Sequence, residues 1–227
     1  MLKWLRANGC IWDVKTCNNA AAGGHLDVLK WVRENEPPCP WKSATLVEAA
    51  FGGHLEVLKW AIEQGCPRHD MGICQKAAEG GHVAIIQWMI DEQGFSLEKG
   101  GALCPDAARG GQYETLKWLR ERGGKWNSTT TSFAAQGGHF EMLKWAKEQG
   151  CPLGVDCCAY AASKGRIGIL RWLRDQNCPW NAETTHAAAS HLNWEVFRYA
   201  VTHGCPVSER TERVLAKSKV DYTLLYY

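Results

Sequence analysis

The chain has 227 residues, of which 45% are hydrophobic and 22% charged, and its formal net charge at pH 7 is +2. This composition is ordinary for a globular protein, and the nearly balanced charge argues against a strongly basic nucleic-acid-binding protein. No apolar run approaches the ~20 residues that a transmembrane helix needs, and the charged N-terminal stretch does not have the form of a secretory signal peptide. We therefore expect neither a nucleic acid nor a membrane as the partner.

A repeated motif organises almost the whole sequence. The triplet Gly-Gly-His occurs four times and Gly-Gly-Gln once, beginning at Gly23, Gly52, Gly80, Gly137 and Gly110 respectively. A tryptophan follows six residues after each His or Gln, and this column continues in both directions through Trp4, Trp31, Trp60, Trp88, Trp118, Trp145, Trp172 and Tyr199. Its steps are 27 to 30 residues, and an Ala-Ala pair precedes each Gly-Gly. Self-similarity at such a period is the signature of a repeat array.

In chain order, we predict a partial first repeat over residues 1–13, about seven repeats of 27–30 residues over residues 14–207, and a degenerate C-terminal cap over residues 208–227. Helix pairs this short cannot bury their apolar faces alone, so the repeats must stack on their neighbours. We therefore predict a single domain over residues 1–227. Because Met1 enters in the middle of a unit, the sequence leaves open whether the chain is a piece of a longer protein.

Each unit is predicted to contain two short helices. In the unit that starts near residue 43, residues 43–50 form the first helix, which the Gly-Gly pair ends because glycine is a poor helix former and a favourable C-terminal cap. The second helix begins at His54, and Gly-Cys-Pro at residues 65–67 ends it because proline cannot continue a helix. Its apolar stripe is predicted to consist of Leu55, Leu58 and Ile62.

Three units are longer than the basic step of 27 residues. Their extra residues fall at residues 36–38, at residues 71–72 and at residues 96–101. We predict that all three insertions are local bulges in loops.

The sequence of residues 48–60, Glu-Ala-Ala-Phe-Gly-Gly-His-Leu-Glu-Val-Leu-Lys-Trp, resembles the ankyrin repeat, and the resemblance extends over nearly the whole chain. It implies an all-α, ankyrin-like helix–turn–helix repeat solenoid. A standard ankyrin unit has 33 residues, and the residues missing here map onto its β-hairpin finger, so we predict that the fingers are shortened or absent. The Leu-Lys-Trp motifs and the Gly-Cys-Pro and Cys-Pro-Trp endings are similar to those of ankyrin arrays from giant DNA viruses and protists.

The chain contains 11 cysteines, and six of them occupy the same slot in different units, namely Cys10, Cys39, Cys66, Cys151, Cys178 and Cys205. Equivalent atoms in adjacent helical layers lie ~8–10 Å apart, whereas the Cα atoms of a disulfide lie within ~7 Å. We therefore expect reduced, buried thiols and a cytoplasmic, reducing compartment.

No metal, cofactor or catalytic site is expected. The sequence has no Cys-x-x-Cys pair, and the spacing of His186 and His191 is poor for sharing a metal ion. The recurring histidines begin second helices, where bonding to neighbouring backbone is the expected role, and a catalytic residue would not recur by register. Gly-Gly here ends a helix and lacks the pattern of a phosphate-binding loop.

A basic column precedes the tryptophans and consists of Lys3, Lys30, Lys59, Lys117, Lys144, Arg171 and Arg198. Such a stripe could bind phosphates. Most units also have an acid three residues earlier, at Asp27, Glu56, Glu114, Glu141 and Glu195, and these i,i+3 pairs would neutralise it. We therefore favour a solvated convex face over a nucleic-acid track, and we expect the tryptophans to pack in the core or, at Trp12, Trp41, Trp126 and Trp180, over the junctions between units.

The resemblance implies a protein-interaction scaffold, with a partner protein on the concave face formed by the inter-unit tips and the exposed side of the first helices. The positions that vary there between units are Lys15, Asn18, Lys42, Glu48, Arg68, His69, Gln75, Glu98, Lys99, Ser128, Thr130, Asp156, Glu183 and Thr184. Similar arrays accompany an F-box in viral and protist relatives, so a substrate-recruiting arm of a ubiquitin-ligase adaptor is an alternative if an F-box lies upstream. The scaffold is expected to be monomeric.

Overall fold

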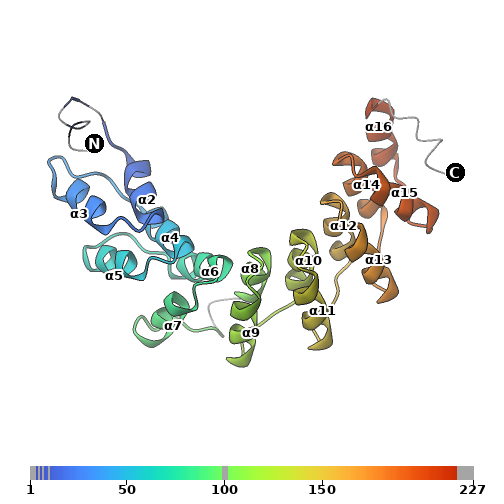
Figure 1. The fold of residues 1–227 in the computed structure, drawn as a ribbon, viewed down its shortest axis with the longest axis horizontal. Coiled ribbons are helices and arrows are strands. Elements are labelled where there is room, and N and C mark those ends of the chain that lie inside the picture. Colours follow the sequence, from blue (N-terminus) through green and yellow to red (C-terminus); the bar gives the residue numbers. More distant parts are fainter. Residues whose placement is uncertain (1–3, 5, 7, 10, 99–101, 219–227) are drawn as a thin grey trace. The chain divides into compact units, whose positions relative to one another are not determined.

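The computed structural model describes residues 4, 6, 8, 9, 11–98 and 102–218 of the chain (Figure 1). Every regular element in these residues is helical, and none of them forms a strand. Consecutive helices pair as the repeat predicts, with a short turn inside each pair and a longer tip between pairs. The predicted fold class, an all-α array of helix–turn–helix repeats without β-hairpin fingers, is confirmed for the described residues.

The chain divides into two compact units. The first comprises Met1–Leu103 and Glu114–Gly124, and the second comprises Cys104–Tyr113 and Lys125–Tyr227. The helices of the first unit are α2 (Val14–Ala22), α3 (Leu26–Glu34), α4 (Ser43–Gly52), α5 (Leu55–Glu63), α6 (Asp70–Gly80), α7 (Val83–Asp91) and, from its second residue, α9 (Tyr113–Glu121). Those of the second unit are α8 (Cys104–Arg109), α10 (Ser128–Gly137), α11 (Phe140–Glu148), α12 (Asp156–Ser163), α13 (Ile167–Asp175), α14 (Ala182–Ser190), α15 (Trp194–Thr202) and α16 (Glu209–Ser218).

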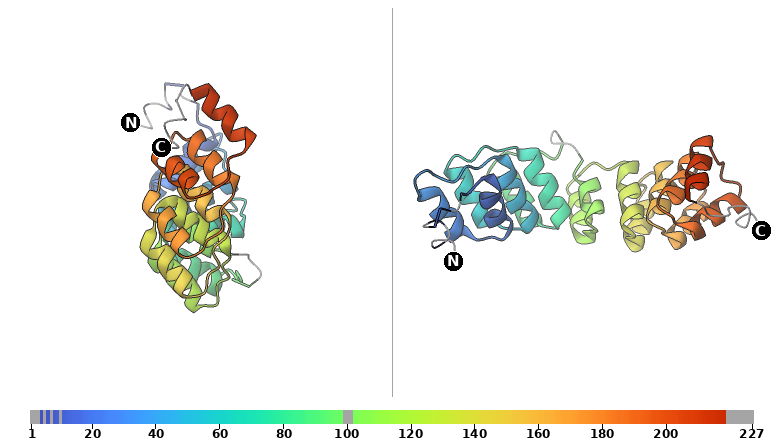
Figure 2. Two further views of the ribbon diagram at one scale, coloured as in Figure 1. Left: turned by 90° about the vertical axis from the view of Figure 1, so that its right-hand side faces the viewer. Right: turned by 90° about the horizontal axis from the view of Figure 1, so that it is seen from above.

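The even-numbered helices, from α2 to α16, are called the first helices here, and the odd-numbered helices, from α3 to α15, the second helices. Within each unit the first helices lie side by side in one layer, and the second helices lie in the other (Figures 1 and 2). The most extensive contacts within the units join successive first helices. The Ala-Ala pairs explain this closeness, because alanines such as Ala49 and Ala50 are fully buried and allow neighbouring helices to approach.

Side-chain caps begin several of the first helices. The Asp13 carboxylate accepts hydrogen bonds from the amides of Lys15 and Thr16, at 2.9 and 3.3 Å. The amide oxygens of Asn127 and Asn181 accept one such bond each, at 2.9 and 3.0 Å. These residue types are the favoured N-caps because they satisfy amides that have no partner inside the helix.

The Gly-Gly-His motif joins each repeat to the one before it. The ring nitrogen Nε2 of His82 donates a 2.9 Å hydrogen bond to the carbonyl of Phe51, and Nε2 of His54 does the same to the carbonyl of Ala22. The second glycine, such as Gly53 with φ of +80°, takes the left-handed conformation that ends the first helix. The predicted bonding of these histidines to neighbouring backbone is thereby confirmed at His54 and His82.

The second helices bury a slightly different stripe from the predicted one. In α5 the buried residues are Val57, Leu58 and Ala61. Of the predicted stripe only Leu58 is fully buried, whereas Leu55 and Ile62 are half-buried. The buried stripe is therefore rotated around the helix relative to the predicted one. It lies on the side of α5 that packs against the first helices, and Leu55 and Ile62 lie at its border with solvent.

The insertions behave as predicted at two of three places. Residues 36–38 and residues 96–98 lie in loops, and residues 99–101 fall outside the described part of the chain. Residues 71–72 do not form a bulge, which corrects the prediction. They lie inside α6, which has 11 residues and therefore takes up the insertion as extra helix.

Several tryptophans lie at the edge of the core and bridge successive repeats. Trp41, which follows one second helix, makes an edge-to-face contact with Trp60 of the next at a centroid distance of 5.9 Å. Trp126 and Trp145 repeat the contact at 5.8 Å. The guanidinium of Arg33 also lies 4.1 Å from the Trp41 ring centroid, a cation–π arrangement. The prediction that tryptophans cover the junctions between repeats is confirmed at Trp41 and Trp126.

The cysteine column forms a ladder along the tips. Each described thiol donates to a backbone carbonyl of the preceding repeat, from Cys39 to Asp13 (3.2 Å), Cys66 to Lys42 (3.5 Å), Cys151 to Asn127 (3.3 Å), Cys178 to Gly154 (3.4 Å) and Cys205 to Asn181 (3.3 Å). The ten described cysteines are buried and form no disulfide with one another, and Cys10 lies outside the described residues. Their predicted burial as packing residues is confirmed.

These thiols are expected to react slowly in the native protein. Burial raises the pKa of Cys66 and of Cys205 to about 11 and the pKa of Cys74 to about 12. Because the thiolate is the reactive form, a Cys10→Ser variant treated with a chromogenic disulfide reagent at pH 8 should show no fast phase, and all ten thiols should react at once in denaturant. A fast native phase at pH 8 would contradict the buried ladder.

The last described helix, α16, packs on α14. It buries Thr211 and Leu215 and exposes charged residues such as Arg213 and Lys217 on its outer side. A polar outer face is what a terminal repeat needs, and the assignment of residues 208–227 as the cap stays a prediction. Residues 219–227 of the cap lie outside the described residues. No helix in the described residues is long and apolar enough to cross a membrane.

Candidate functional site

The residues predicted to bind a partner fall into several structural classes. Exposed side chains are found at Lys15, Lys42, Arg68, His69, Glu98, Asp156 and Glu183. Half-buried side chains are found at Asn18, Glu48, Gln75 and Ser128. Thr130 and Thr184 are fully buried, and Lys99 lies outside the described residues. Most of the described positions are therefore accessible to a partner.

The expected exposure of Thr130 and Thr184 was wrong. Both precede an Ala-Ala pair by four residues, and the corresponding Thr45, Ile73 and Cys157 are also fully buried. This position is therefore buried in the core rather than exposed to solvent. Neither residue is available to a partner in the folded protein.

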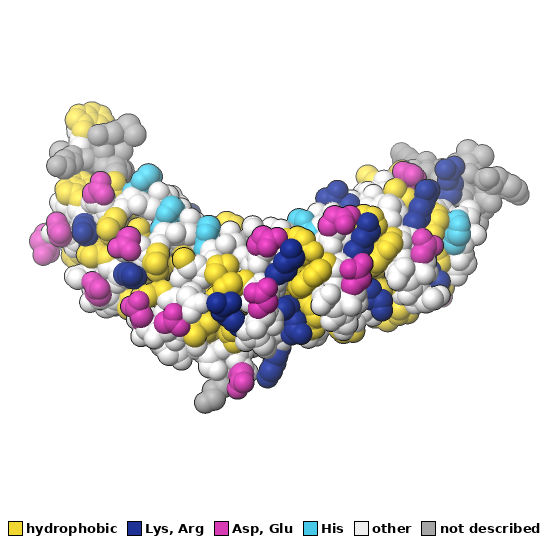
Figure 3. All heavy atoms as spheres, turned by 60° about the horizontal axis from the view of Figure 1, so that its bottom comes forward, with side chains coloured by type: hydrophobic (Ala, Val, Ile, Leu, Met, Phe, Trp, Pro, Cys, Tyr) yellow, Lys and Arg dark blue, Asp and Glu magenta, His cyan; other side chains and the backbone are white. Residues whose placement is uncertain are grey.

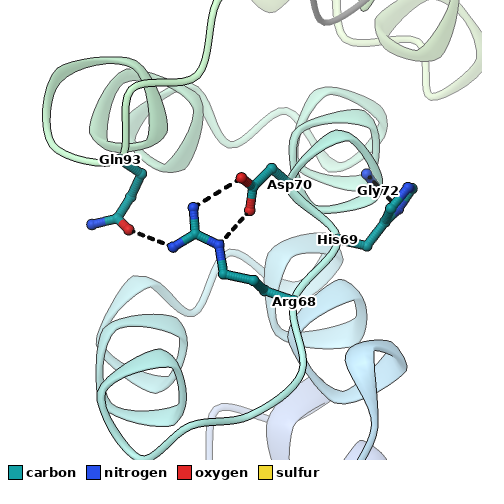
Figure 4. A network of polar contacts seen from close by, with 5 residues as sticks. All are labelled: Arg68, His69, Asp70, Gly72 and Gln93. Atoms are coloured by element: carbon teal, nitrogen blue, oxygen red, sulfur yellow. Dashed lines mark hydrogen bonds and ion pairs between the residues drawn. The ribbon is translucent and has the colours of Figure 1, made fainter.

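Arg68 and His69 lie at one tip but have separate tasks (Figure 4). The Arg68 guanidinium donates to both carboxylate oxygens of Asp70, at 2.6 and 2.8 Å, and to Oε1 of Gln93 at 2.8 Å. The His69 ring accepts a 3.1 Å hydrogen bond from the amide of Gly72 and so caps α6. The Asp70 carboxylate raises the pKa of Arg68. These two side chains fix the tip, and only their outer edges remain available for binding.

Asn18 is also partly committed to the fold. Its Oδ1 accepts a 2.8 Å hydrogen bond from the Thr45 hydroxyl, which links α2 to α4. Among the predicted site residues of the first unit, Asn18, Arg68 and His69 therefore take part in hydrogen bonds of the fold. Lys15, Lys42 and Glu48 show no side-chain hydrogen bond or ion pair within the described part of the chain.

The second unit carries a row of large side chains that the sequence analysis did not select. On its first helices, the guanidinium of Arg109 lies 4.1 Å from the Phe133 ring centroid, and the Phe133 and Tyr160 centroids are 6.1 Å apart. Phe133 and Tyr160 occupy the same register position as Glu48, one residue before Ala-Ala. The signal was therefore present in the register, because this position is polar or charged from Asn19 to Asp106 and becomes aromatic in the next two repeats.

Beside Tyr160 the surface of the second unit is hollowed. This cavity, called the α12–α14 hollow here, has a volume of about 350 Å³. Its lining residues are Gln136, Asp156, Ala159, Tyr160, Ser163, Lys164, Glu183, Ala187 and His191. The aromatic column continues from Phe133 and Tyr160 to Ala187, so the small side chain at Ala187 leaves the space. Of the predicted site residues, the structure brings Asp156 and Glu183 together here.

Charge is distributed unevenly around the α12–α14 hollow. Asp156 begins α12 and Glu183 lies in the first turn of α14, so both carboxylates are at the N-terminal ends of their helices. Glu183 lies 3.6 Å from the Arg210 guanidinium of α16, with both side chains more than half exposed. Lys164 and His191 lie just beyond the C-terminal ends of the same two helices. One end of the hollow is therefore acidic and the other is basic or neutral.

Two further hollows lie in the first unit. One of about 390 Å³ is lined by second-helix and tip residues, which are Lys30, Arg33, Glu34, Trp41, Trp60 and Gln64. Another of about 470 Å³ lies at α2 and is lined by Asp13, Lys15, Thr16, Asn19, Ala20, His25 and Val28. Only the second of these contains a predicted site residue, Lys15.

The second-helix surface has no continuous basic track in the part that Figure 3 shows, since Lys and Arg side chains alternate there with Asp and Glu. Glu114 pairs with Lys117 at 3.2 Å and Glu141 with Lys144 at 3.0 Å, which confirms the predicted i,i+3 neutralisation at these two sites. Lys30 lies instead above the Trp60 ring, with its ammonium 5.9 Å from the centroid.

The described residues contain no group of three or more His, Cys, Asp or Glu side chains that could hold a metal ion. His186 is buried in α14, where its Nε2 lies 3.2 Å from the Ser190 hydroxyl. Burial, reinforced by the nearby Arg210 charge, lowers the pKa of His186. This histidine is a neutral packing residue and not a member of a cluster with catalytic geometry.

His186 should make stability depend on pH. Its pKa in the folded protein lies below the value of about 6.5 in an unfolded chain, so the unfolded state takes up more protons as pH falls below about 6.5. The free energy of unfolding should therefore decrease as pH falls from about 6.5 toward the folded pKa. A His186→Gln variant should lose part of this dependence in urea titrations at several pH values, and an unchanged slope would contradict the assignment.

No protein-family model and no curated protein matches the sequence. Among solved structures, the chain is similar to the ankyrin repeat domain of human ASB11, with a TM-score of 0.48 and 17% sequence identity. The alignment covers 88% of this chain and 96% of that domain.

Proposed function

We propose that the chain is a protein-interaction module that binds a partner protein on the exposed side of its first helices and on the adjoining tips. The observation that carries the proposal is the separation of two kinds of position. The Ala-Ala, Gly-Gly and Cys positions recur from repeat to repeat and are occupied by packing and turns. The outer positions of the first helices differ from repeat to repeat and lie at the surface.

The side chains at these outer positions suit a protein partner. Arginine and aromatic residues are enriched at protein interfaces and dominate their energetics. In the second unit Arg109, Phe133 and Tyr160 form a continuous row on the surface of three successive first helices. Phe51 on α4 is a further aromatic residue in the neighbouring column, and it is 47% exposed.

The surface formed by the second helices also favours a protein over a nucleic acid as the partner. On the second-helix side, Lys117 and Lys144 are neutralised by i,i+3 ion pairs, and Lys30 lies over the ring of Trp60. A phosphate-binding track needs unopposed cations because its affinity comes from counterion release. A partner protein on the first helices is therefore favoured over a nucleic acid on the second helices.

The proposal is tested by affinity capture from a reducing cell lysate, with mass-spectrometric identification of bound proteins. The intact chain is compared with a Phe133→Ala, Tyr160→Ala double variant and with a control double variant, Lys147→Ala and Glu148→Ala. The control pair is exposed on the second helix α11, and neither side chain makes a hydrogen bond or an ion pair within the described residues. Circular dichroism and thermal melting establish that both variants remain folded.

A partner that the control variant captures and the first-helix variant loses would support the proposal. A partner that both variants capture equally would show that the row on the first helices does not contribute. A partner lost only from the control variant would place binding on the second helices and overturn the proposed surface.

A further inference from the structure

We propose that the α12–α14 hollow is a subsite for a peptide segment of the partner that presents one arginine or lysine next to an apolar side chain. The inference rests on the proposed function and specifies its partner chemistry. It is carried by the acidic end of the hollow, its apolar middle and its basic or neutral far end, which together fit one such segment in one direction.

The acidic end provides the binding site for the cation. Asp156 and Glu183 are 27 residues apart and therefore occupy the same register position on neighbouring helices. Both are exposed, and Asp156 has no ion-pair partner among the described residues. Two carboxylates that line one hollow favour a guanidinium or an ammonium more than either carboxylate does alone.

The structure already places a guanidinium beside one of these two carboxylates. Arg210 occupies the same register position on α16, another 27 residues on, and lies 3.6 Å from the Glu183 carboxylate. Because both side chains are more than half exposed, solvent screens this ion pair and it is weak. A ligand cation that contacts both carboxylates can therefore displace it at little cost.

The middle of the hollow accepts apolar groups. Ala159, Ala187 and the ring of Tyr160 line it between the two ends. A long basic side chain buries its methylene groups on such a surface while its charged head remains at the carboxylates, and a tyrosine ring attracts a cation that approaches its face. The volume of about 350 Å³ suits one or two side chains of an extended segment.

The far end sets the direction and excludes polybasic ligands. Lys164 and His191 line it together with the polar side chains of Gln136 and Ser163. A second basic residue of the ligand would meet the Lys164 ammonium there and be repelled. The expected segment therefore has its cation at the N-terminal ends of α12 and α14 and an uncharged or acidic residue at their C-terminal ends.

The inference is tested by selecting short random peptides, displayed on phage, against the full chain and sequencing the bound population. Peptides from the enriched set are then synthesised with a fluorescent label, and their affinities are measured by fluorescence anisotropy. The hollow is altered in two ways, by the charge-removing pair Asp156→Asn and Glu183→Gln and by the space-filling change Ala187→Leu. Glu141→Gln on α11 is the matched control, and Phe133→Ala reports on the neighbouring part of the first helices.

The inference predicts that the enriched peptides carry a single arginine or lysine beside an apolar residue. Their affinity should fall about tenfold or more in the Asp156→Asn, Glu183→Gln variant and in Ala187→Leu, and it should be unchanged in Glu141→Gln. Enrichment without this pattern, no enrichment, or affinities that do not respond to the hollow variants would each overturn it. Peptides that respond to Phe133→Ala alone would overturn the subsite and leave the proposed function standing, whereas peptides insensitive to every first-helix change would count against both.

Discussion

Replacing Phe197 with alanine is expected to lower the free energy of unfolding by about 3–5 kcal/mol. Phe197 lies in α15, and it is the largest of the fully buried side chains in the described part of the chain. Its removal loses the transfer free energy of the ring and leaves a cavity among well-packed neighbours. The loss should appear as a lower midpoint in urea denaturation followed by circular dichroism.

Phe51→Ala is the matched control for this change. The same ring is removed, but Phe51 is 47% exposed on α4, so the free energy of unfolding should change by no more than about 1 kcal/mol. Equal losses in the two variants would contradict the assignment of the core to the space between the helix layers. A much larger loss for Phe197→Ala would support both the burial of α15 and the solvent exposure of the first-helix surface.

The substitution Gly53→Ala should destabilise the protein strongly, with an expected loss of about 2–3 kcal/mol. Its φ of +80° costs a residue with a Cβ about 1–2 kcal/mol. The new Cβ would also lie 2.5 Å from the His82 ring, which is held by its hydrogen bond to the Phe51 carbonyl. Moving the ring away costs that bond, which contributes about 1 kcal/mol.

Two other glycines separate the cost of the positive φ from the cost of the contact with the His82 ring. Gly65 has a φ of +76° but nothing within 4 Å of an added Cβ, so Gly65→Ala should cost about 1–2 kcal/mol. Gly168 lies inside α13 with an ordinary helical φ and open space, so Gly168→Ala should stabilise the protein by up to about 1 kcal/mol. Chemical denaturation of the three variants should give this order, and a Gly53→Ala loss no larger than that of Gly65→Ala would show that the His82 contact does not matter.

The repeat register made much of the fold predictable. Positions that recur have recurrent causes: Gly53 and its equivalents end helices, Ala49 and Ala50 allow close packing, and the cysteines fill the tips. The paired helices and the absence of fingers in the described residues follow from the 27-residue step. These features depend on local sequence and on the contacts of one repeat with the next, both of which the register makes visible.

The candidate site was less predictable because exposure depends on the direction of each side chain. The register position of Thr130 and Thr184 varies between repeats, but both side chains are fully buried, so variation alone was not a sufficient sign of a surface position. Arg68 was selected as a binding residue, but its bonds to Asp70 and Gln93 became evident only once the tip was folded. Polar and charged residues at tips can stabilise the fold or bind a partner, and the sequence does not distinguish the two.

The α12–α14 hollow lay beyond the sequence analysis for a related reason. It exists because Ala187 occupies the position that Phe133 and Tyr160 fill in the preceding repeats. The absence of a large side chain becomes a cavity only when the neighbouring helices are in place. Comparing residue size within a column, rather than residue type alone, would have indicated its position.

The central claim, that a partner protein binds to the first helices, is tested most directly by site-specific photo-cross-linking. A benzophenone amino acid is placed either at Gln136, which lines the α12–α14 hollow, or at Lys147, which is exposed on the second helix α11. Each protein is irradiated with the partner identified by affinity capture. The account predicts a cross-linked product from position 136 and little or none from position 147. A product from position 147 alone would contradict it.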